Sequence, residues 1–128
     1  MSRTLLVTDD AVIIREIIKD IAISVGWKIV GEASNGREAA QRYAELRPDA
    51  CTLDLVMPKY DGLYALREII KFDPDAQVVV VSALNQKKIL IDALRAGAAD
   101  FVVKPFDRNL LVETLEQMVP AETAASSG

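Results

Sequence analysis

Short apolar runs and longer amphipathic segments alternate along the chain. The apolar runs at 4–8, 27–30, 50–53, 78–81 and 101–103 are three to five residues long and predict strands. Four consecutive valines make up the run at 78–81, which is typical of a strand covered on both faces, as in a parallel sheet. Between and after these runs, apolar residues recur at helical spacing and predict helices at 12–25, 36–46, 63–70, 89–94 and 108–118.

The residues at the predicted helix ends favour capping or termination. Gly26 is placed to end the first helix in a left-handed cap, and Gly97 is placed to end the fourth helix. Asn35, with Glu38 three residues later, resembles a capping box, and Asp107 suits the N-cap of the last helix. In the first helix, an apolar face lies opposite a polar one. The apolar face contains Val12, Ile14, Ile17, Ile18, Ile21 and Val25, and the polar face contains Arg15, Glu16, Lys19 and Asp20.

The alternation of strands and helices predicts a doubly wound α/β fold, a (βα)5 sandwich around a five-stranded parallel sheet. Right-handed crossovers would bring the carboxyl end of every strand to one edge of the sheet, where ligands bind in such folds. No repeat or internal boundary interrupts the pattern. We therefore expect one domain over 1–119, followed at 120–128 by a small-residue tail that is disordered or begins a linker.

Composition narrows the function classes. The chain of 128 residues has a net charge of −4 and no basic run, so no nucleic-acid surface is indicated. No stretch approaches the length of a membrane span, and the apolar run near the amino terminus is too short for a signal peptide. The single cysteine, Cys51, excludes an internal disulfide and fits a reducing compartment. We expect a cytoplasmic protein that binds neither nucleic acid nor membrane.

The chain contains no histidine. This absence excludes nucleophilic catalysis of the Ser-His-Asp and Cys-His classes. It also excludes zinc sites built on a pair of histidines, and one cysteine is too few for a thiolate metal centre. Any chemistry must therefore use carboxylates, hydroxyls or amines.

Polar residues stand at the carboxyl ends of four of the predicted strands. They are Asp9 and Asp10, Asp54, Ser82 and Lys104. Each has an ordinary reading: Asp54 could open a loop, Asp10 could cap a helix, Ser82 could terminate a strand and Lys104 could be a surface charge. Their joint occurrence, at strand ends that share one edge of the sheet, favours a site. The end of the second strand, residues 31–33, has no assignment.

Such a site contains the groups needed for phosphoryl transfer to a carboxylate. Three carboxylates close together repel one another unless a cation lies among them. Oxygen ligands in a shallow site suit Mg²⁺ better than Ca²⁺. Lys104 and Ser82 could then engage the anionic phosphoryl group, in a reaction where positioning and charge neutralisation supply most of the catalysis.

These residues also carry a family resemblance. Asp9-Asp10, the segment 54–62, Ser82-Ala83 and Lys104-Pro105-Phe106 resemble the receiver domain of two-component response regulators. The resemblance covers residues 4–118 and is closest to stand-alone regulators of the chemotaxis type. It implies the flavodoxin-like strand order 2-1-3-4-5. It also implies a signalling switch that catalyses only its own phosphorylation and dephosphorylation.

The resemblance implies a role for each site residue. Asp54 would be the phosphoacceptor, and Lys104 would pair with the phosphoryl group. Mg²⁺ would be held by Asp9, Asp10, Asp54 and the main-chain carbonyl of Val56. Ser82 and Phe101 would form the switch, and Val56, Ala83 and Leu84 would flank the site. The bond between Lys104 and Pro105 is often cis in this family.

The implied partners follow from the same resemblance. A sensor histidine kinase would donate the phosphoryl group, since this chain has no histidine of its own. An output protein, with the flagellar motor switch as a candidate, would bind the face formed by the fourth helix, fifth strand and fifth helix. A phosphatase could reset the switch. The protein would be a monomer or a phosphorylation-dependent dimer.

Departures from the family pattern predict a slow reset. Ser82 stands where threonine is commoner, and Phe101 lacks the hydroxyl of a tyrosine. Val56 and Leu84 are apolar at the two positions where polar residues can orient an attacking water. We therefore expect slow self-hydrolysis of the phosphoryl group.

Other functions fit the site residues less well, with one exception. A haloacid-dehalogenase-like phosphatase would need an aspartate where Val56 stands. A flavodoxin-like module would place a flavin phosphate beside Asp9 and Asp10, which would repel it. No glycine-rich dinucleotide or P-loop motif occurs. A receiver domain cut from a larger, DNA-binding regulator remains the main alternative.

Overall fold

The structure is a computed structural model that describes residues 3–58, 60–83 and 85–120. Most of the tail predicted at 120–128 lies outside these residues. The strands are β1 (Thr4–Thr8), β2 (Lys28–Ala33), β3 (Ala50–Asp54), β4 (Val78–Ala83) and β5 (Asp100–Lys104). The helices are α1 (Val12–Ser24), α2 (Gly36–Leu46), α3 (Gly62–Phe72), α4 (Lys87–Ala96) and α5 (Arg108–Met118). The predicted alternation of strands and helices is confirmed.

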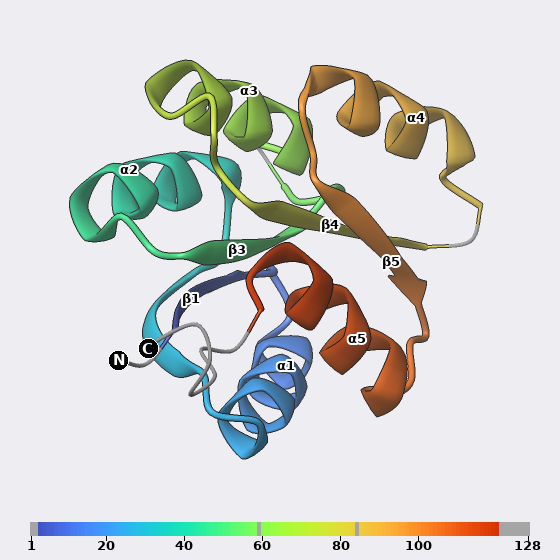
Figure 1. Ribbon diagram of the computed structural model, residues 1–128. Helices are drawn as coiled ribbons and strands as arrows, with labels where there is room; N and C mark the ends of the chain where they lie inside the picture. Colours follow the sequence, from blue (N-terminus) through green and yellow to red (C-terminus); the bar gives the residue numbers. More distant parts are fainter. Residues whose placement is uncertain (1–2, 59, 84, 121–128) are drawn as a thin grey trace.

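The strands form one five-stranded sheet in the order β2-β1-β3-β4-β5, in which all neighbouring strands are parallel. Helices α2, α3 and α4 cover one face of this sheet, and α1 and α5 cover the other (Figure 1). The doubly wound fold and its strand order are therefore confirmed.

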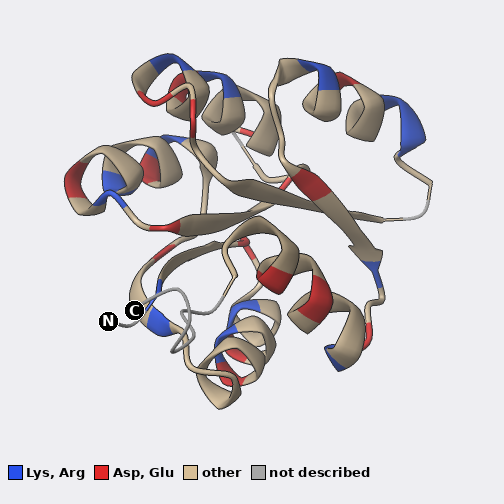
Figure 2. Cartoon of the chain, viewed as in Figure 1, with Lys and Arg blue, Asp and Glu red and all other residues tan. Residues whose placement is uncertain are grey.

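Two apolar cores hold the layers together. On the face covered by α2, α3 and α4, Leu6, Val78 and Val80 are buried, whereas Leu5 and Val79 are buried on the opposite face. Neighbouring positions of one strand thus enter different cores, which explains the continuous apolar runs. Charged residues lie mainly on the helices, and the strands carry few of them (Figure 2).

Helix ends follow the capping chemistry of the sequence. Asn35 accepts a hydrogen bond from the backbone N–H of Glu38 at 2.9 Å, and Asp107 accepts one from Leu110 at 2.8 Å. The carboxylate of Glu38 accepts from the backbone N–H of Ser34 instead of completing the box at Asn35. Gly97 ends α4, as predicted, and it does so with a φ of 116°.

The structure corrects two predictions. Strand β2 runs from Lys28 to Ala33 and so includes the unassigned segment 31–33, while Trp27 lies outside the strand and is buried in the core that also contains residues of α1 and α5. On α1, Val12 and Ile17 are 61% and 42% exposed, so the apolar face of this helix is wider than the surface that it buries. No helix in the described part of the chain has both the length and the apolar character that a membrane span requires.

Candidate functional site

The carboxyl edge of the sheet brings the three predicted aspartates together. Asp9 follows β1 and Asp54 ends β3, and these two carboxylates are 1% and 5% exposed. Asp10, the next residue after Asp9, is exposed. One carboxylate oxygen from each of the three lies within 4.8 Å of the other two. The convergence predicted from the strand ends is therefore confirmed.

Lys104, the last residue of β5, places its ammonium between the two buried carboxylates. Its Nζ lies 2.8 Å from Oδ2 of Asp9 and 3.6 Å from Oδ2 of Asp54. The closer pairing is thus with Asp9. Among the described residues, Lys104 is the one lysine or arginine that pairs with these carboxylates, so the negative charge of this part of the site exceeds the positive charge.

Every polar group of Asp9 has a partner. Its Oδ1 accepts from the backbone N–H of Ala11 at 2.9 Å, and its Oδ2 accepts from Lys104. Its backbone N–H donates to the carbonyl of Ala33 at 3.1 Å, and its carbonyl accepts from Arg15. The N-cap residue of α1 is Ala11, which provides no side-chain cap. The ordinary reading of Asp10 as this N-cap is therefore wrong.

The surroundings of Asp54 disfavour its negative charge. Burial raises the pKa of the Asp54 carboxyl, and the nearby charge of Asp9 raises it further, to about 6, against the opposing influence of Lys104 and of the Val56 N–H. That N–H donates to Oδ1 of Asp54 at 3.2 Å. Burial lowers the pKa of Lys104, but its hydrogen bond to Asp9 and the charge of Asp54 outweigh burial, so the net shift is upward. The ammonium is therefore retained.

The donor set fits Mg²⁺. Two buried carboxylates and one exposed carboxylate are close enough to share a cation. All three offer hard oxygen ligands, and the exposed side leaves room for the waters that Mg²⁺ retains. A cation among these oxygens would offset the repulsion that raises the pKa of Asp54.

Of the other predicted site residues, Ser82, Ala83 and Val56 lie at the same edge, whereas Phe101 lies near the start of β5, where it pairs with Val80. Ser82 is buried in β4, one residue beyond Val81, which pairs with Asp54 in the sheet. Phe101 of β5 is 40% exposed and Val56 is 45% exposed. The bond between Lys104 and Pro105 is cis, as expected. The backbone N–H of Ala83 donates to Oε1 of Gln86 at 3.0 Å, and Leu84 lies outside the described residues.

Sequence reasoning missed a basic residue that contacts the site. Arg15 was grouped with the polar face of α1, yet its Nη1 donates to the carbonyl of Asp9 at 2.6 Å and its Nε donates to Glu32 at 3.0 Å. Two signals were present. Arg15 and Lys19 are one helical turn apart, and the unassigned end of the second strand carries an acidic residue, Glu32.

Comparison with known proteins agrees with this geometry. The family model for the response regulator receiver domain matches residues 5–116. The chemotaxis protein CheY of Thermotoga maritima is 45% identical over 118 residues, which cover 92% of this chain and 98% of that protein. CheY of Bacillus subtilis is 42% identical over 117 residues, which cover 91% of this chain and 98% of that protein.

Solved structures show the same relationship. The response regulator domain of Thermotoga maritima CheB matches with a TM-score of 0.81 and 38% identity, covering 92% of this chain and 94% of that one. CheY in the CheX–CheY–BeF3–Mg complex of Borrelia burgdorferi matches with a TM-score of 0.85 and 35% identity, covering 90% of this chain and 87% of that one. The chain belongs to the family of response regulator receiver domains and is homologous to the CheY chemotaxis proteins.

Proposed function

We propose that this protein is a chemotaxis-type phosphorylation switch that accepts a phosphoryl group on Asp54 in a Mg²⁺-dependent reaction. The observation that carries the proposal is the grouping of Asp9, Asp10 and Asp54 around one shared position, with Lys104 beside them. The relatives named above are chemotaxis proteins, and one of them was crystallised with Mg²⁺ and beryllium trifluoride. The lone, buried thiol of Cys51 supports a cytoplasmic location.

The chemistry follows from the placement of the residues. A carboxylate oxygen of Asp54 attacks the phosphorus of a phosphohistidine, the P–N bond breaks, and its electron pair stays on the imidazole nitrogen, which then takes a proton. The Val56 N–H holds Oδ1 of Asp54 and so orients the nucleophile. The ammonium of Lys104 is placed to pair with the transferred group. Mg²⁺, held by Asp9, Asp10, Asp54 and the main-chain carbonyl of Val56, would neutralise the negative charge of the phosphoryl oxygens.

A protein donor suits the surface beside Asp54. The chain has no histidine, so a phosphohistidine must arrive on a partner, and a sensor histidine kinase has the required chemistry. Val12 and Ile13, at the start of α1, are 61% and 67% exposed. An apolar pocket of about 280 Å³ lies next to them, lined by Ile14, Ile17, Lys104, Pro105 and Phe106. Exposed apolar patches of this kind mark surfaces where proteins dock.

The output surface is proposed to be α4, β5 and α5. A phosphoryl group on Asp54 would attract the hydroxyl of Ser82, and the ring of Phe101 could then move into the space behind β4. Phe101 borders a pocket of about 280 Å³ between β5 and α5, so its movement would reshape this face. An output protein that binds one shape more tightly shifts the population towards it. The flagellar motor switch is a candidate partner, and phosphorylation could also favour a dimer.

A second candidate function is that of a receiver domain within a larger regulator. The methylesterase of Archaeoglobus fulgidus is 42% identical over 102 residues, but these cover only 29% of that protein. Receiver domains related to this chain thus also occur inside longer proteins. A stop codon directly after residue 128 of the gene would favour the single-domain switch, with its receiver at 1–119, and a longer reading frame would favour the alternative. The family assignment leaves no support for the phosphatase and flavodoxin-like readings.

Phosphoryl uptake from acetyl phosphate tests the proposed function. We expect the full chain to take up about one phosphoryl group in the presence of Mg²⁺ and none after chelation of the cation, because three carboxylates repel the anionic donor. Intact-protein mass spectrometry measures the uptake. The variant Asp54→Asn should take up none, while retaining its circular dichroism spectrum. Equal uptake by Asp54→Asn and by the wild type would contradict the proposal.

The lifetime of the phosphoryl group should depend on Val56. This exposed side chain lies two residues after Asp54 and cannot orient a water molecule by hydrogen bonding. We expect Val56→Asn to shorten the half-life of the phosphorylated protein several-fold, and the double variant with Leu84→Glu to shorten it further. The decay of phosphorylated protein after removal of acetyl phosphate measures this. Ile23→Asn, at an exposed position of α1, is the control. An unchanged half-life in the double variant would refute the explanation.

A further inference from the structure

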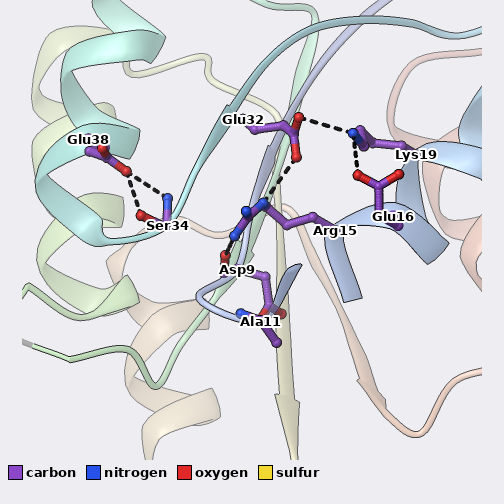
Figure 3. Close-up of polar contacts among 8 residues, drawn as sticks. All are labelled: Asp9, Ala11, Arg15, Glu16, Lys19, Glu32, Ser34 and Glu38. Atoms are coloured by element: carbon purple, nitrogen blue, oxygen red, sulfur yellow. Dashed lines mark hydrogen bonds and ion pairs between the residues drawn. The ribbon is translucent and has the colours of Figure 1, made fainter. Parts of the chain in front are cut away.

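The carbonyl of Asp9 is held by a side chain from α1. Nη1 of Arg15 donates to this carbonyl at 2.6 Å, and Nε of the same guanidinium donates to Oε1 of Glu32 at 3.0 Å (Figure 3). The Arg15 side chain is 15% exposed. The guanidinium therefore bridges the end of β1 to the end of β2.

Arg15 is itself anchored by a chain of charges. The second carboxylate oxygen of Glu32 accepts from Nζ of Lys19 at 3.0 Å, and Lys19 also pairs with Glu16 at 2.7 Å. The hydrogen bond from Lys19 and the one from Arg15 hold the pKa of Glu32 below its usual value, although partial burial raises it. Glu32 therefore stays ionised at neutral pH and fixes the guanidinium in place.

The hydrogen bond from Arg15 acts on the peptide group between two of the predicted metal ligands. The carbonyl of Asp9 belongs to the peptide group that joins Asp9 to Asp10, and both residues offer ligand atoms to the cation position. On the other side of Asp9, its N–H donates to the carbonyl of Ala33, the residue after Glu32. Strand β2 thus contacts Asp9 in two ways. Ala33 binds the N–H of Asp9 directly, and Glu32 binds Arg15, which in turn binds the carbonyl of the Asp9–Asp10 peptide.

We propose that Arg15, anchored by Glu32, is a positioning residue that holds the Asp9–Asp10 peptide so that both carboxylates face one cation. This inference rests on the proposed use of Mg²⁺. In metalloproteins, residues that hydrogen-bond to metal ligands orient those ligands, and loss of such a residue weakens metal binding. Arg15 contributes no ligand atom to the cation and acts only through Asp9.

The direction in which the Mg²⁺ affinity changes when Arg15 is replaced tests the proposal. The guanidinium carries a positive charge close to the cation position, so its charge alone repels Mg²⁺. Removing only a charge would therefore tighten Mg²⁺ binding. Removing a positioning contact would weaken it, because the two carboxylates would no longer be oriented in advance. The two effects have opposite directions, and a change in global stability alters neither in the folded protein.

A matched control is available in the same region. Arg42 of α2 lines a pocket of about 470 Å³ together with Arg15 and Glu32. In the described part of the chain the side chain of Arg42 makes no hydrogen bond or ion pair, and its charge acts on Glu38 and not on Asp9. Arg42→Gln therefore removes the same charge as Arg15→Gln without removing a contact to Asp9. Arg15→Lys retains the charge but replaces the planar fork with a shorter point charge.

The experiment is a calorimetric titration of the full chain with Mg²⁺, at a temperature where unfolding curves show each variant to be folded. We expect Arg15→Gln to raise the Kd for Mg²⁺ on the order of tenfold, Arg15→Lys to raise it less, and Arg42→Gln to leave it unchanged or lower it. A Kd for Arg15→Gln equal to or below that of Arg42→Gln would overturn the positioning role. Absence of Mg²⁺ binding by the wild type would instead contradict the proposed function.

Discussion

The variant Lys104→Met should accept a phosphoryl group on the order of 10²-fold more slowly than the wild type. The ammonium lies 2.8 Å from Asp9 and 3.6 Å from Asp54, and no second lysine or arginine forms an ion pair with either carboxylate among the described residues. Methionine retains most of the apolar stem and removes the charge that would pair with the phosphoryl oxygens. Stopped-flow or quenched mass spectrometry with acetyl phosphate and saturating Mg²⁺ measures the rate.

The same variant should bind Mg²⁺ at least as tightly as the wild type, because the ammonium and the cation are attracted by the same carboxylates. A slow reaction with intact Mg²⁺ binding would separate the role of Lys104 from that of the metal ligands. Lys87→Met, at an exposed position at the start of α4, is the control and should react at the wild-type rate. Equal rates for the two variants would contradict the assigned role of Lys104.

The variant Gly62→Ala should lose about 3 kcal/mol or more of its free energy of unfolding. Gly62 is the buried first residue of α3, and its N–H donates to the carbonyl of Leu55 at 3.1 Å. A methyl group here would lie 2.6 Å from Cα of Leu55 and would also overlap the carbonyl oxygen of Asp54. Both neighbours are backbone atoms at the end of β3, so the acceptor residue itself must shift.

Phosphoryl uptake should fall together with stability in this variant, since the displaced backbone carries Asp54. Urea unfolding measures the first effect and acetyl phosphate uptake the second. Gly31→Ala, in β2, is a suitable control. Its methyl group would meet Cδ1 of Leu46 at 2.7 Å, the far end of a side chain that is 40% exposed and free to turn away. A loss in Gly62→Ala no larger than in Gly31→Ala would contradict the steric argument.

Much of the fold could be predicted because the strands are buried on both sides. Val78 and Val80 enter one core and Val79 enters the other, and such a run leaves little ambiguity between a strand and a loop. Strand β2 was predicted less well because it lies at the edge of the sheet, where most of its residues are only partly buried. Glu32 interrupts its apolar pattern, and the ion pairs that stabilise Glu32 come from α1, thirteen to seventeen residues away.

The candidate site was predictable for a different reason. Parallel strands place their carboxyl ends at one edge, so Asp9, Asp54 and Lys104 could be brought together from their positions alone. Contacts made by long side chains across elements could not be found in this way. Arg15 binds the main-chain carbonyl of Asp9. Every residue has such a carbonyl, so the sequence does not indicate which one a side chain binds. Val12, at the start of α1, was likewise placed on the apolar face of the helix although it is exposed, because helical spacing does not show where the sheet ends.

The central claim, that Asp54 accepts the phosphoryl group, can be tested at the level of the single residue. Borohydride reduces an aspartyl phosphate to homoserine, so treatment of the protein after incubation with acetyl phosphate and Mg²⁺ marks the acceptor position. Peptide mass spectrometry then locates the converted residue. We predict homoserine at position 54 alone, in amounts that follow the phosphoryl uptake of the intact protein. Conversion of Asp9 or Asp10, or phosphoryl uptake without conversion at position 54, would contradict the claim.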